Sequence, residues 1–316
     1  MRIGIDLGGT KIEALALDDN GIELVRIRKP TPRDSYESIV AAIVGMVGDV
    51  EAQLGAQGTV GVGIPGTISP ATGLVKNANT TQLIGHPLDR DLARHLGQRV
   101  RVANDANCFA LSEAGDGAAA MPEHVGGSPR VVFGVILGTG TGGGVVVDGR
   151  IIEGPDGIGG EWGHMPLPWP QDHEWPLPKC WCGRVGCVEL FLSGPGMAAD
   201  HHRATGVLLN GPDLVDAAAA GETTALATIS RYEHRLARGL AVIINILNPH
   251  VIVLGGGVSN IARLYENVPK LWEQFVFSDV VSTRLVKARH GDSSGVRGAA
   301  WLWPIEAAAR LLEGNF

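Results

Sequence analysis

The chain has 316 residues, a formal net charge of −7 at pH 7 and 45% hydrophobic residues. This length exceeds one ordinary hydrophobic core and favours two globular domains. Basic residues are scattered along an acidic chain, which argues against a nucleic-acid or membrane partner. No apolar run reaches the roughly 20 residues of a membrane-spanning helix and no signal-peptide pattern begins the chain, so we expect a cytoplasmic protein with small soluble ligands.

The first third of the chain predicts alternating strands and helices. Apolar alternation indicates three short strands, and two glycine-containing turns, Gly8-Gly9 and Asn20-Gly21, join them. A helix with Ser35 as its cap follows. The expected strands are 3–6, 14–17, 24–26, 60–64 and 100–103, and the expected helices are 35–54, 89–96 and 106–114.

Residues 131–152 repeat the design of the first segment: strand, glycine turn, strand, Asx-Gly turn, strand. This internal duplication favours two similar domains. We place a smaller N-terminal α/β domain at 1–120 and a larger C-terminal α/β domain at 121–297, with the boundary in the polar segment 121–129. A last helix, beginning near 296–298 and rich in Ala and Trp, is expected to pack back on the first domain.

Further along the chain, 232–247 has a strong helical pattern and 251–254 is a buried strand. The glycines that follow, Gly255 to Gly257, would let a ligand lie against the backbone. We expect Ser259 or Asn260 to cap the next helix.

Two glycine runs have the spacing G-x-G-x-x-G, but neither opens a helix, as a dinucleotide-binding fingerprint must. A P-loop is excluded too, because Thr10-Lys11 reverses the required order. What remains is one glycine turn with a threonine in each duplicated segment. Such turns either bind phosphate oxygens through backbone N–H groups or serve as plain hairpin turns. Their residues are Gly8, Gly9 and Thr10, and Gly138, Thr139 and Gly140.

Two carboxylates stand at strand ends. Asp6 precedes the first glycine turn and would either hold hydrated Mg²⁺ or serve a structural role with a partner. Lys11, just after that turn, could be only a solvated strand charge. Asp105 stands where a strand meets a helix, so it is either a helix cap or a general base.

Cys180, Cys182 and Cys187 form most of a tetrahedral zinc site, and His164 and His173 are the nearby candidates for the fourth ligand. A reduced, metal-free loop is the alternative. Cys108 stands apart and is expected to be a buried apolar residue. Glu161, with His164, and Glu189 bracket the cysteine loop. These acids would either bind the hydroxyls of a polar ligand or be ordinary surface acids.

In combination and in this order, the motifs resemble the ROK sugar kinases of the actin-like ATPase superfamily across nearly the whole chain. Within that family they look most like bacterial fructokinases of the mannokinase type. The motifs are Asp6 to Lys11, Gly63 to Gly66, Ala103 to Asn107, Leu137 to Gly144, Gly160 to His164, Cys180 to Glu189, and, for the fructokinases, Val75 to Asn79, Pro166 to Trp169 and His290 to Trp301.

The resemblance implies duplicated actin-like (ribonuclease H-like) α/β domains with an interdomain cleft. It implies an ATP-dependent kinase for the 6-hydroxyl of fructose, with mannose as an additional substrate and Asp105 as the general base. ATP and Mg²⁺ would bind at Asp6, Gly8, Gly9, Thr10, Lys11, Gly138, Thr139, Gly140, Gly255, Gly256 and Gly257, with Asp6 reaching Mg²⁺ through water. The sugar would bind at Gly66, Asn104, Asp105, Glu161, His164 and Glu189, and structural Zn²⁺ at His164, Cys180, Cys182 and Cys187. Family likeness also suggests a homodimer.

Three alternatives stay open. A sister kinase for glucose, mannose or N-acetylglucosamine is the serious one, because loop positions decide which hydroxyls are recognised. A sugar-responsive transcription factor would carry a helix-turn-helix before the strand at Ile3, for which there is no room. A sugar-binding protein without catalysis would not need Asp105.

Overall fold

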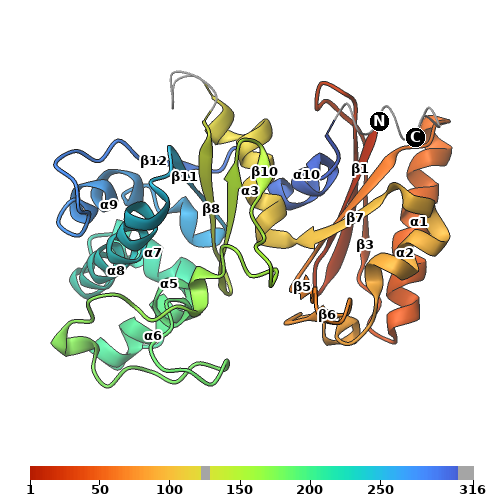
Figure 1. Ribbon diagram of the computed structural model, residues 1–316. Coiled ribbons are helices and arrows are strands. Elements are labelled where there is room, and N and C mark those ends of the chain that lie inside the picture. Colours follow the sequence, from red (N-terminus) through yellow and green to blue (C-terminus); the bar gives the residue numbers. More distant parts are fainter. Residues whose placement is uncertain (122–128, 305–316) are drawn as a thin grey trace. The chain divides into compact units, whose positions relative to one another are not determined.

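The computed structural model describes residues 1–121 and 129–304, which form two compact units with α/β folds (Figure 1). Unit 1 comprises Met1–Gly117, Gly149–Gly159 and the chain from Asp292 onward, and unit 2 comprises Ala118–Asp148 and Gly160–Gly291. Most of the expected boundary segment and the expected last helix beyond residue 304 lie outside the described residues.

Unit 1 contains a five-stranded mixed sheet with the order β3-β2-β1-β4-β7. The expected hairpin strands are confirmed, with β1 antiparallel to β2 and parallel to β4. The strands are β1 (Arg2–Leu7), β2 (Lys11–Leu17), β3 (Glu23–Pro30), β4 (Thr59–Ile64) and β7 (Val100–Asn104), with a separate small hairpin of β5 (Thr67–Ile68) and β6 (Val75–Lys76). The helices are α1 (Tyr36–Leu54), α2 (Leu88–Leu96), α3 (Asp105–Gly115) and α10 (Ser294–Trp301).

Helix α1 begins where the sequence predicts. The Ser35 hydroxyl oxygen accepts a hydrogen bond from the backbone N–H of Ser38, and the Ser38 hydroxyl oxygen accepts one from the backbone N–H of Ser35. This capping box satisfies N–H groups that have no partner inside the helix. The buried face of α1 then packs on one side of the sheet, which is visible in Figure 1.

The two faces of the first sheet meet different helices. Ile3, Ile5 and Leu7 of β1 point into the core beneath α1 and α2, whereas α10 packs on the opposite face (Figure 1). There the packing is backbone against backbone: a Cβ added to Gly61 of β4 would lie 1.8 Å from the carbonyl oxygen of Ala299. Gly61 of the first G-x-G-x-x-G run therefore serves helix packing, and α10, which ends at Trp301, belongs to unit 1.

Unit 2 repeats the plan: its strands β9, β8, β11 and β12 belong to a second sheet with the order β10-β9-β8-β11-β12, in which β10 comes from the segment Gly149–Gly159 assigned to unit 1. Helices α8 and α9 cover one face of this sheet and form the main core with it (Figure 1). The strands are β8 (Val131–Leu137), β9 (Thr141–Val147), β10 (Arg150–Ile151), β11 (Val251–Gly255) and β12 (Arg284–Lys287). The helices are α5 (Glu189–Leu192), α6 (Gly194–Thr205), α7 (Gly211–Ala219), α8 (Thr223–Leu247) and α9 (Leu264–Trp272).

Two helix starts differ from expectation. Helix α8 begins at Thr223 rather than near residue 232, because the Glu222 carboxylate accepts hydrogen bonds from the first free N–H groups. The expected cap at Ser259 or Asn260 is wrong. Those residues belong to a short 3-10 helix, Gly257–Asn260, and α9 starts later, at Leu264, without a side-chain cap.

Among residues 1–121 and 129–304, none of the helices combines the length and the apolar character needed to cross a membrane.

Gly61→Ala should destabilise the protein by about 1–3 kcal/mol, because the added methyl group overlaps the Ala299 carbonyl and forces α10 off the sheet. Gly48→Ala is the matched control. Gly48 lies in α1 with open space around its Cα, so alanine there should stabilise the helix by about 0.5–1 kcal/mol. Thermal unfolding measures both. Equal melting temperatures for the two variants would show that the close contact does not constrain the fold.

Candidate active site

The predicted site residues fall into two groups, one in each compact unit. In unit 1 the group is centred on the junction of β7 and α3. Asn104, the last residue of β7, is the N-cap of α3, and its side-chain oxygen accepts hydrogen bonds from the N–H groups of Ala106 (2.9 Å) and Asn107 (3.3 Å). The cap is therefore Asn104, whereas Asp105 is the first helical residue, with one carboxylate oxygen 2.8 Å from the Ala106 N–H.

The same Asn104 side chain joins the junction to the loop after β4. Its amide nitrogen donates to the carbonyl oxygen of Gly66 at 3.0 Å. Gly66 has a φ of 85°, and a Cβ there would lie 2.4 Å from the carbonyl of Lys76. Three predicted sugar-binding residues, Gly66, Asn104 and Asp105, are thus held together by one amide side chain.

Asp6 lies near the end of β1, and the groups around it disfavour its charge. Burial, and then the carboxylates of Asp105 and Glu13, raise the pKa of Asp6 to about 7, and Lys11 opposes them only partly. Glu13 lies directly across the hairpin from Asp6. An acidic group of this kind suits a bound cation that neutralises it.

The first glycine turn follows Asp6. The Gly8 N–H bonds to the Lys11 carbonyl, and the Thr31 hydroxyl donates to the Gly8 carbonyl at 2.7 Å. Lys11 is half-exposed, and its ammonium group lies 3.7 Å from the Glu13 carboxylate. It is therefore a partly solvated strand charge with an acidic neighbour.

In unit 2, the start of β9 positions the second group. A Cβ on Gly163 would lie 2.0 Å from the carbonyl oxygen of Thr141, so the segment that carries Glu161 and His164 lies directly on the strand backbone. The N–H of Thr141 donates to the Glu189 carboxylate at 3.0 Å. Glu189, at the start of α5, is thereby tied to the turn that contains Gly138, Thr139 and Gly140.

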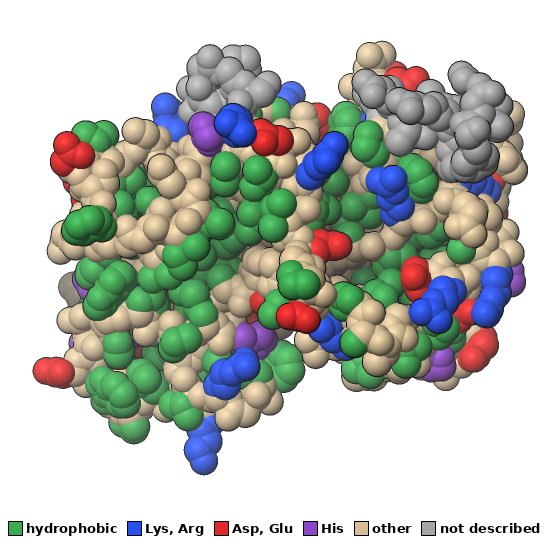
Figure 2. Space-filling view, in the orientation of Figure 1, with side chains coloured by type: hydrophobic (Ala, Val, Ile, Leu, Met, Phe, Trp, Pro, Cys, Tyr) green, Lys and Arg blue, Asp and Glu red, His purple; other side chains and the backbone are tan. Residues whose placement is uncertain are grey.

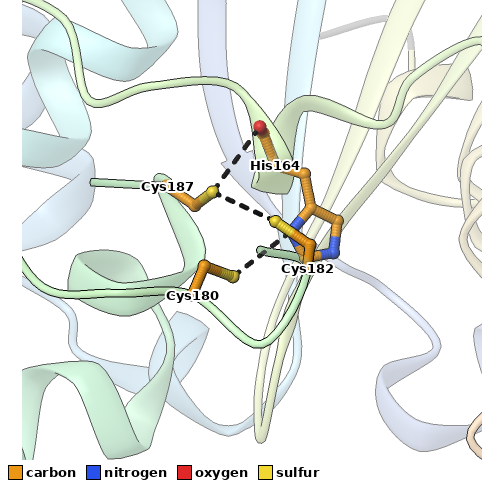
Figure 3. Close-up of side chains that lie close together, drawn as sticks. All are labelled: His164, Cys180, Cys182 and Cys187. Atoms are coloured by element: carbon orange, nitrogen blue, oxygen red, sulfur yellow. Dashed lines mark hydrogen bonds between the residues drawn. The ribbon is translucent and has the colours of Figure 1, made fainter. Parts of the chain in front are cut away.

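His164, Cys180, Cys182 and Cys187 bring their possible ligand atoms within 4.8 Å of one another (Figure 3). The His164 Nδ1 lies 3.7 Å from the Cys180 sulfur, and the Cys182 and Cys187 sulfurs are 3.6 Å apart. Tetrahedral zinc with bonds of about 2.3 Å to sulfur requires sulfur atoms about 3.8 Å apart, so the spacing fits this ion. His173 is not part of the cluster. As expected, Cys108 is fully buried elsewhere, in α3.

A buried ion-pair network holds the loop between His164 and Cys180. Glu174 in this loop accepts from Arg235 (2.7 Å) and Arg238 of α8, and Arg238 also donates to the carbonyls of Pro168 and Trp169. Burial alone would raise the pKa of Glu174, but the two arginines outweigh it, and its pKa is lowered. Sequence reasoning missed this network, because arginines inside a helical pattern are usually solvated.

A pocket of about 700 Å³ opens beside the second glycine turn. It brings together Gly138, Thr139 and Gly257, three residues predicted to bind ATP from segments far apart in the sequence. Sequence reasoning missed the rest of its lining, which comes mainly from α6, α7 and the segments around them and includes Pro195, Met197, Asn210, Gly211, Val215 and Asp216. The only local signals for these residues are the glycine-proline steps that open both helices.

On the face shown in Figure 2, Lys and Arg side chains lie singly or in small groups among acidic and apolar ones.

Comparisons with known proteins give the family. Two N-acetyl-D-glucosamine kinases are similar over nearly their full length: that of Vibrio cholerae is 41% identical over 306 residues (96% of this chain, 99% of the relative), and that of Pectobacterium atrosepticum is 39% identical over 308 residues (96% and 98%). Neither is a fructokinase, so the finer likeness expected from the sequence finds no support in them.

Solved structures agree with the likeness to sugar kinases and with the actin-like fold. The ROK hexokinase of Thermus thermophilus superposes with a TM-score of 0.83 at 30% identity, covering 99% of both chains. A ROK glucokinase of Streptomyces griseus, in complex with glucose and AMPPNP, gives 0.73 at 27% identity over 95% of this chain and 98% of the other. The family model matches residues 2–306. The chain therefore belongs to the ROK family.

Proposed function

We propose that this protein is an ATP-dependent sugar kinase that transfers the γ-phosphoryl group of ATP to the 6-hydroxyl of N-acetylglucosamine. The kinase part rests on one observation: Asn104 holds Asp105 at the start of α3, in a group that also contains Gly66 and the acidic Asp6. The choice of sugar rests on the two relatives named for N-acetylglucosamine. Fructose, which the local motifs favour, is the second candidate.

In this proposal the chain's residues position reactants and move one proton. The oxygen of the sugar hydroxyl forms a bond to the γ-phosphorus, and Asp105 accepts the proton of that hydroxyl. At the same time the bond between the γ-phosphorus and the bridging oxygen breaks, and ADP leaves. Such a transfer depends on positioning and charge neutralisation more than on covalent help from the protein. Mg²⁺ bound with ATP would neutralise phosphate charge, and Asp6 would hold it through water.

The nucleotide and the sugar use different residues of unit 2. The pocket beside the second glycine turn, lined by Gly138, Thr139 and Gly257, would receive the nucleoside, and the turn amides would face its phosphates. Glu161, His164 and Glu189 would bind sugar hydroxyls. His164 can serve two roles, because its Nδ1 faces the cysteine sulfurs and leaves Nε2 for a sugar hydroxyl.

The four-residue cluster would hold zinc in a closed structural site. Bound there, the ion would fix the ring plane of His164 and the loop that leads to Glu189. Burial raises the pKa of Cys187 to about 12 in the metal-free geometry. A cation at this position would reverse that shift, because a cysteine ligand must be a thiolate.

Purified protein should form ADP only when ATP, Mg²⁺ and a sugar are all present. In a panel of N-acetylglucosamine, fructose, mannose and glucose, N-acetylglucosamine should give the highest kcat/KM. Asp105→Asn should keep the fold and the sugar affinity but lower kcat by about 10²-fold or more, because a positioned base is lost. Phosphorylation of none of the four sugars, or near-normal turnover in Asp105→Asn, would contradict the proposal.

Elemental analysis should find one zinc per chain in protein purified without chelator. Cys182→Ser should lose the metal and raise the KM for sugar more than the KM for ATP, because His164 and Glu189 lose their support. Cys108→Ala, which removes a cysteine outside the cluster, should retain zinc and serves as the control. Wild-type protein without zinc would refute the metal site.

Asp6→Asn should stabilise the metal-free protein at pH 8 by about 2–4 kcal/mol, and by less at pH 5. The folded protein keeps a proton on Asp6 up to pH about 7, whereas an unfolded chain releases it near pH 4, so stability falls as pH rises through this window. Melting temperatures of wild type and variant across pH 5–8 test this. Asp279→Asn, at an exposed position outside this acidic group, is the control. If the melting-temperature difference between wild type and Asp6→Asn does not change with pH, the raised pKa of Asp6 is contradicted.

A further inference from the structure

Trp181 lies between two cysteines of the metal cluster and exposes 72% of its surface. Despite this exposure its indole is held at two points. Its Nε1–H donates to one oxygen of the Glu189 carboxylate at 2.9 Å, and its ring meets the His164 ring edge-on, with centroids 4.9 Å apart at 85°. One exposed aromatic ring therefore bridges two of the residues proposed to bind sugar.

The indole completes the placement of Glu189. The second oxygen of this carboxylate accepts from the Thr141 N–H at 3.0 Å, so the two oxygens are held by donors from two different segments. The torsion that rotates a carboxylate is soft, and one donor alone would fix its position poorly. Each oxygen keeps a lone pair free for a ligand hydroxyl. Removing the indole N–H would therefore loosen the group that meets the sugar while leaving its charge.

The rest of the ring surface is open beside these polar atoms. Sugars present hydroxyls along their edge and C–H groups on their faces, so their sites combine a few convergent polar groups with an aromatic surface. A sugar bonded to both His164 and Glu189 lies within contact distance of a ring that touches both. If the ring served only to cover the cysteine loop, we would expect it to be buried there, because burial removes apolar surface from water.

We propose that Trp181 is a positioning residue for Glu189 and a direct contact of the sugar. This inference rests on the proposed function, because it assumes that His164 and Glu189 bind the substrate. Trp175 offers a comparison in the same region of the chain: it exposes 59% of its surface, and its indole makes no hydrogen bond within the described part of the chain.

Trp181→Phe keeps a ring and removes only the N–H. Its KM for N-acetylglucosamine, or for whichever sugar the wild type phosphorylates, should rise about tenfold, in line with the loss of one hydrogen bond to a charged group. Its kcat and its KM for ATP should change less than twofold. Trp181→Ala should raise the sugar KM further, because the ring contact is also lost. Trp175→Phe should match the wild type, and zinc content should be equal in all variants.

A spectroscopic readout separates a sugar contact from a structural role. The chain has seven tryptophans. Without ATP, sugar should change the tryptophan emission of wild type and of Trp175→Phe, but not of Trp181→Phe. In Trp175→Phe, sugar should also protect the emission from quenching by acrylamide, a test that does not depend on how variants at position 181 fold.

The results distinguish a failure of the inference about Trp181 from a failure of the proposed function. If the wild type phosphorylates a sugar but Trp181→Phe retains the wild-type KM, or sugar leaves the quenching unchanged, the inference about Trp181 is wrong and the kinase assignment stands. If Trp181→Phe loses zinc and kcat together with no specific rise in the sugar KM, Trp181 is a structural residue and the inference is again wrong. If the wild type phosphorylates no sugar, the proposed function itself fails.

Discussion

The backbone at the start of β9 is the constraint on which the second group of site residues depends. The carbonyl of Thr141 meets Gly163 so closely that no side chain fits between them, and the N–H of Thr141 holds the Glu189 carboxylate. Trp162, next to Gly163, donates from its indole to the Gly142 carbonyl at 2.9 Å. Because β9 is fixed along its length by pairing with β8, the chain before the cysteine loop and the chain after it are placed from one rigid edge.

In unit 1 the corresponding constraint costs stability. Asn104 satisfies the first N–H groups of α3 and the Gly66 carbonyl at once, which fixes Asp105 at the helix start. Burial is the main cause of the raised pKa of Asp6, and that position places Asp105 close enough to raise it further. A fold under selection for stability alone would replace one of these acids. Their presence together in one unit is a feature expected of a site whose charge is completed by a bound cation.

The parts of this protein that could be predicted from sequence are those specified locally. The two hairpins follow from alternation and turn residues, and the Cys/His cluster follows from three cysteines within eight positions. Other features depend on what the fold brings near. Asn104 rather than Asp105 is the cap because the end of β7 leaves Asn104 in extended geometry. Arg235 and Arg238 are buried because Glu174 and Asp200, far away in sequence, neutralise them. The pocket walls from α6 and α7 carry no motif at all.

Sugar identity belongs with the features that the motifs do not specify. In the proposed mechanism the turns, Asp6 and Asp105 would serve phosphoryl transfer, which is the same reaction for every hexose, so these residues carry no information about the sugar. Discrimination depends on where a few donors, acceptors and apolar surfaces lie around the ring, and each contact contributes only a factor of about ten to a hundred. A residue such as Trp181, at a position that the cysteine spacing leaves free, can change that arrangement without altering any motif. Substrate preference in this protein is therefore to be sought in the side chains between its motif residues.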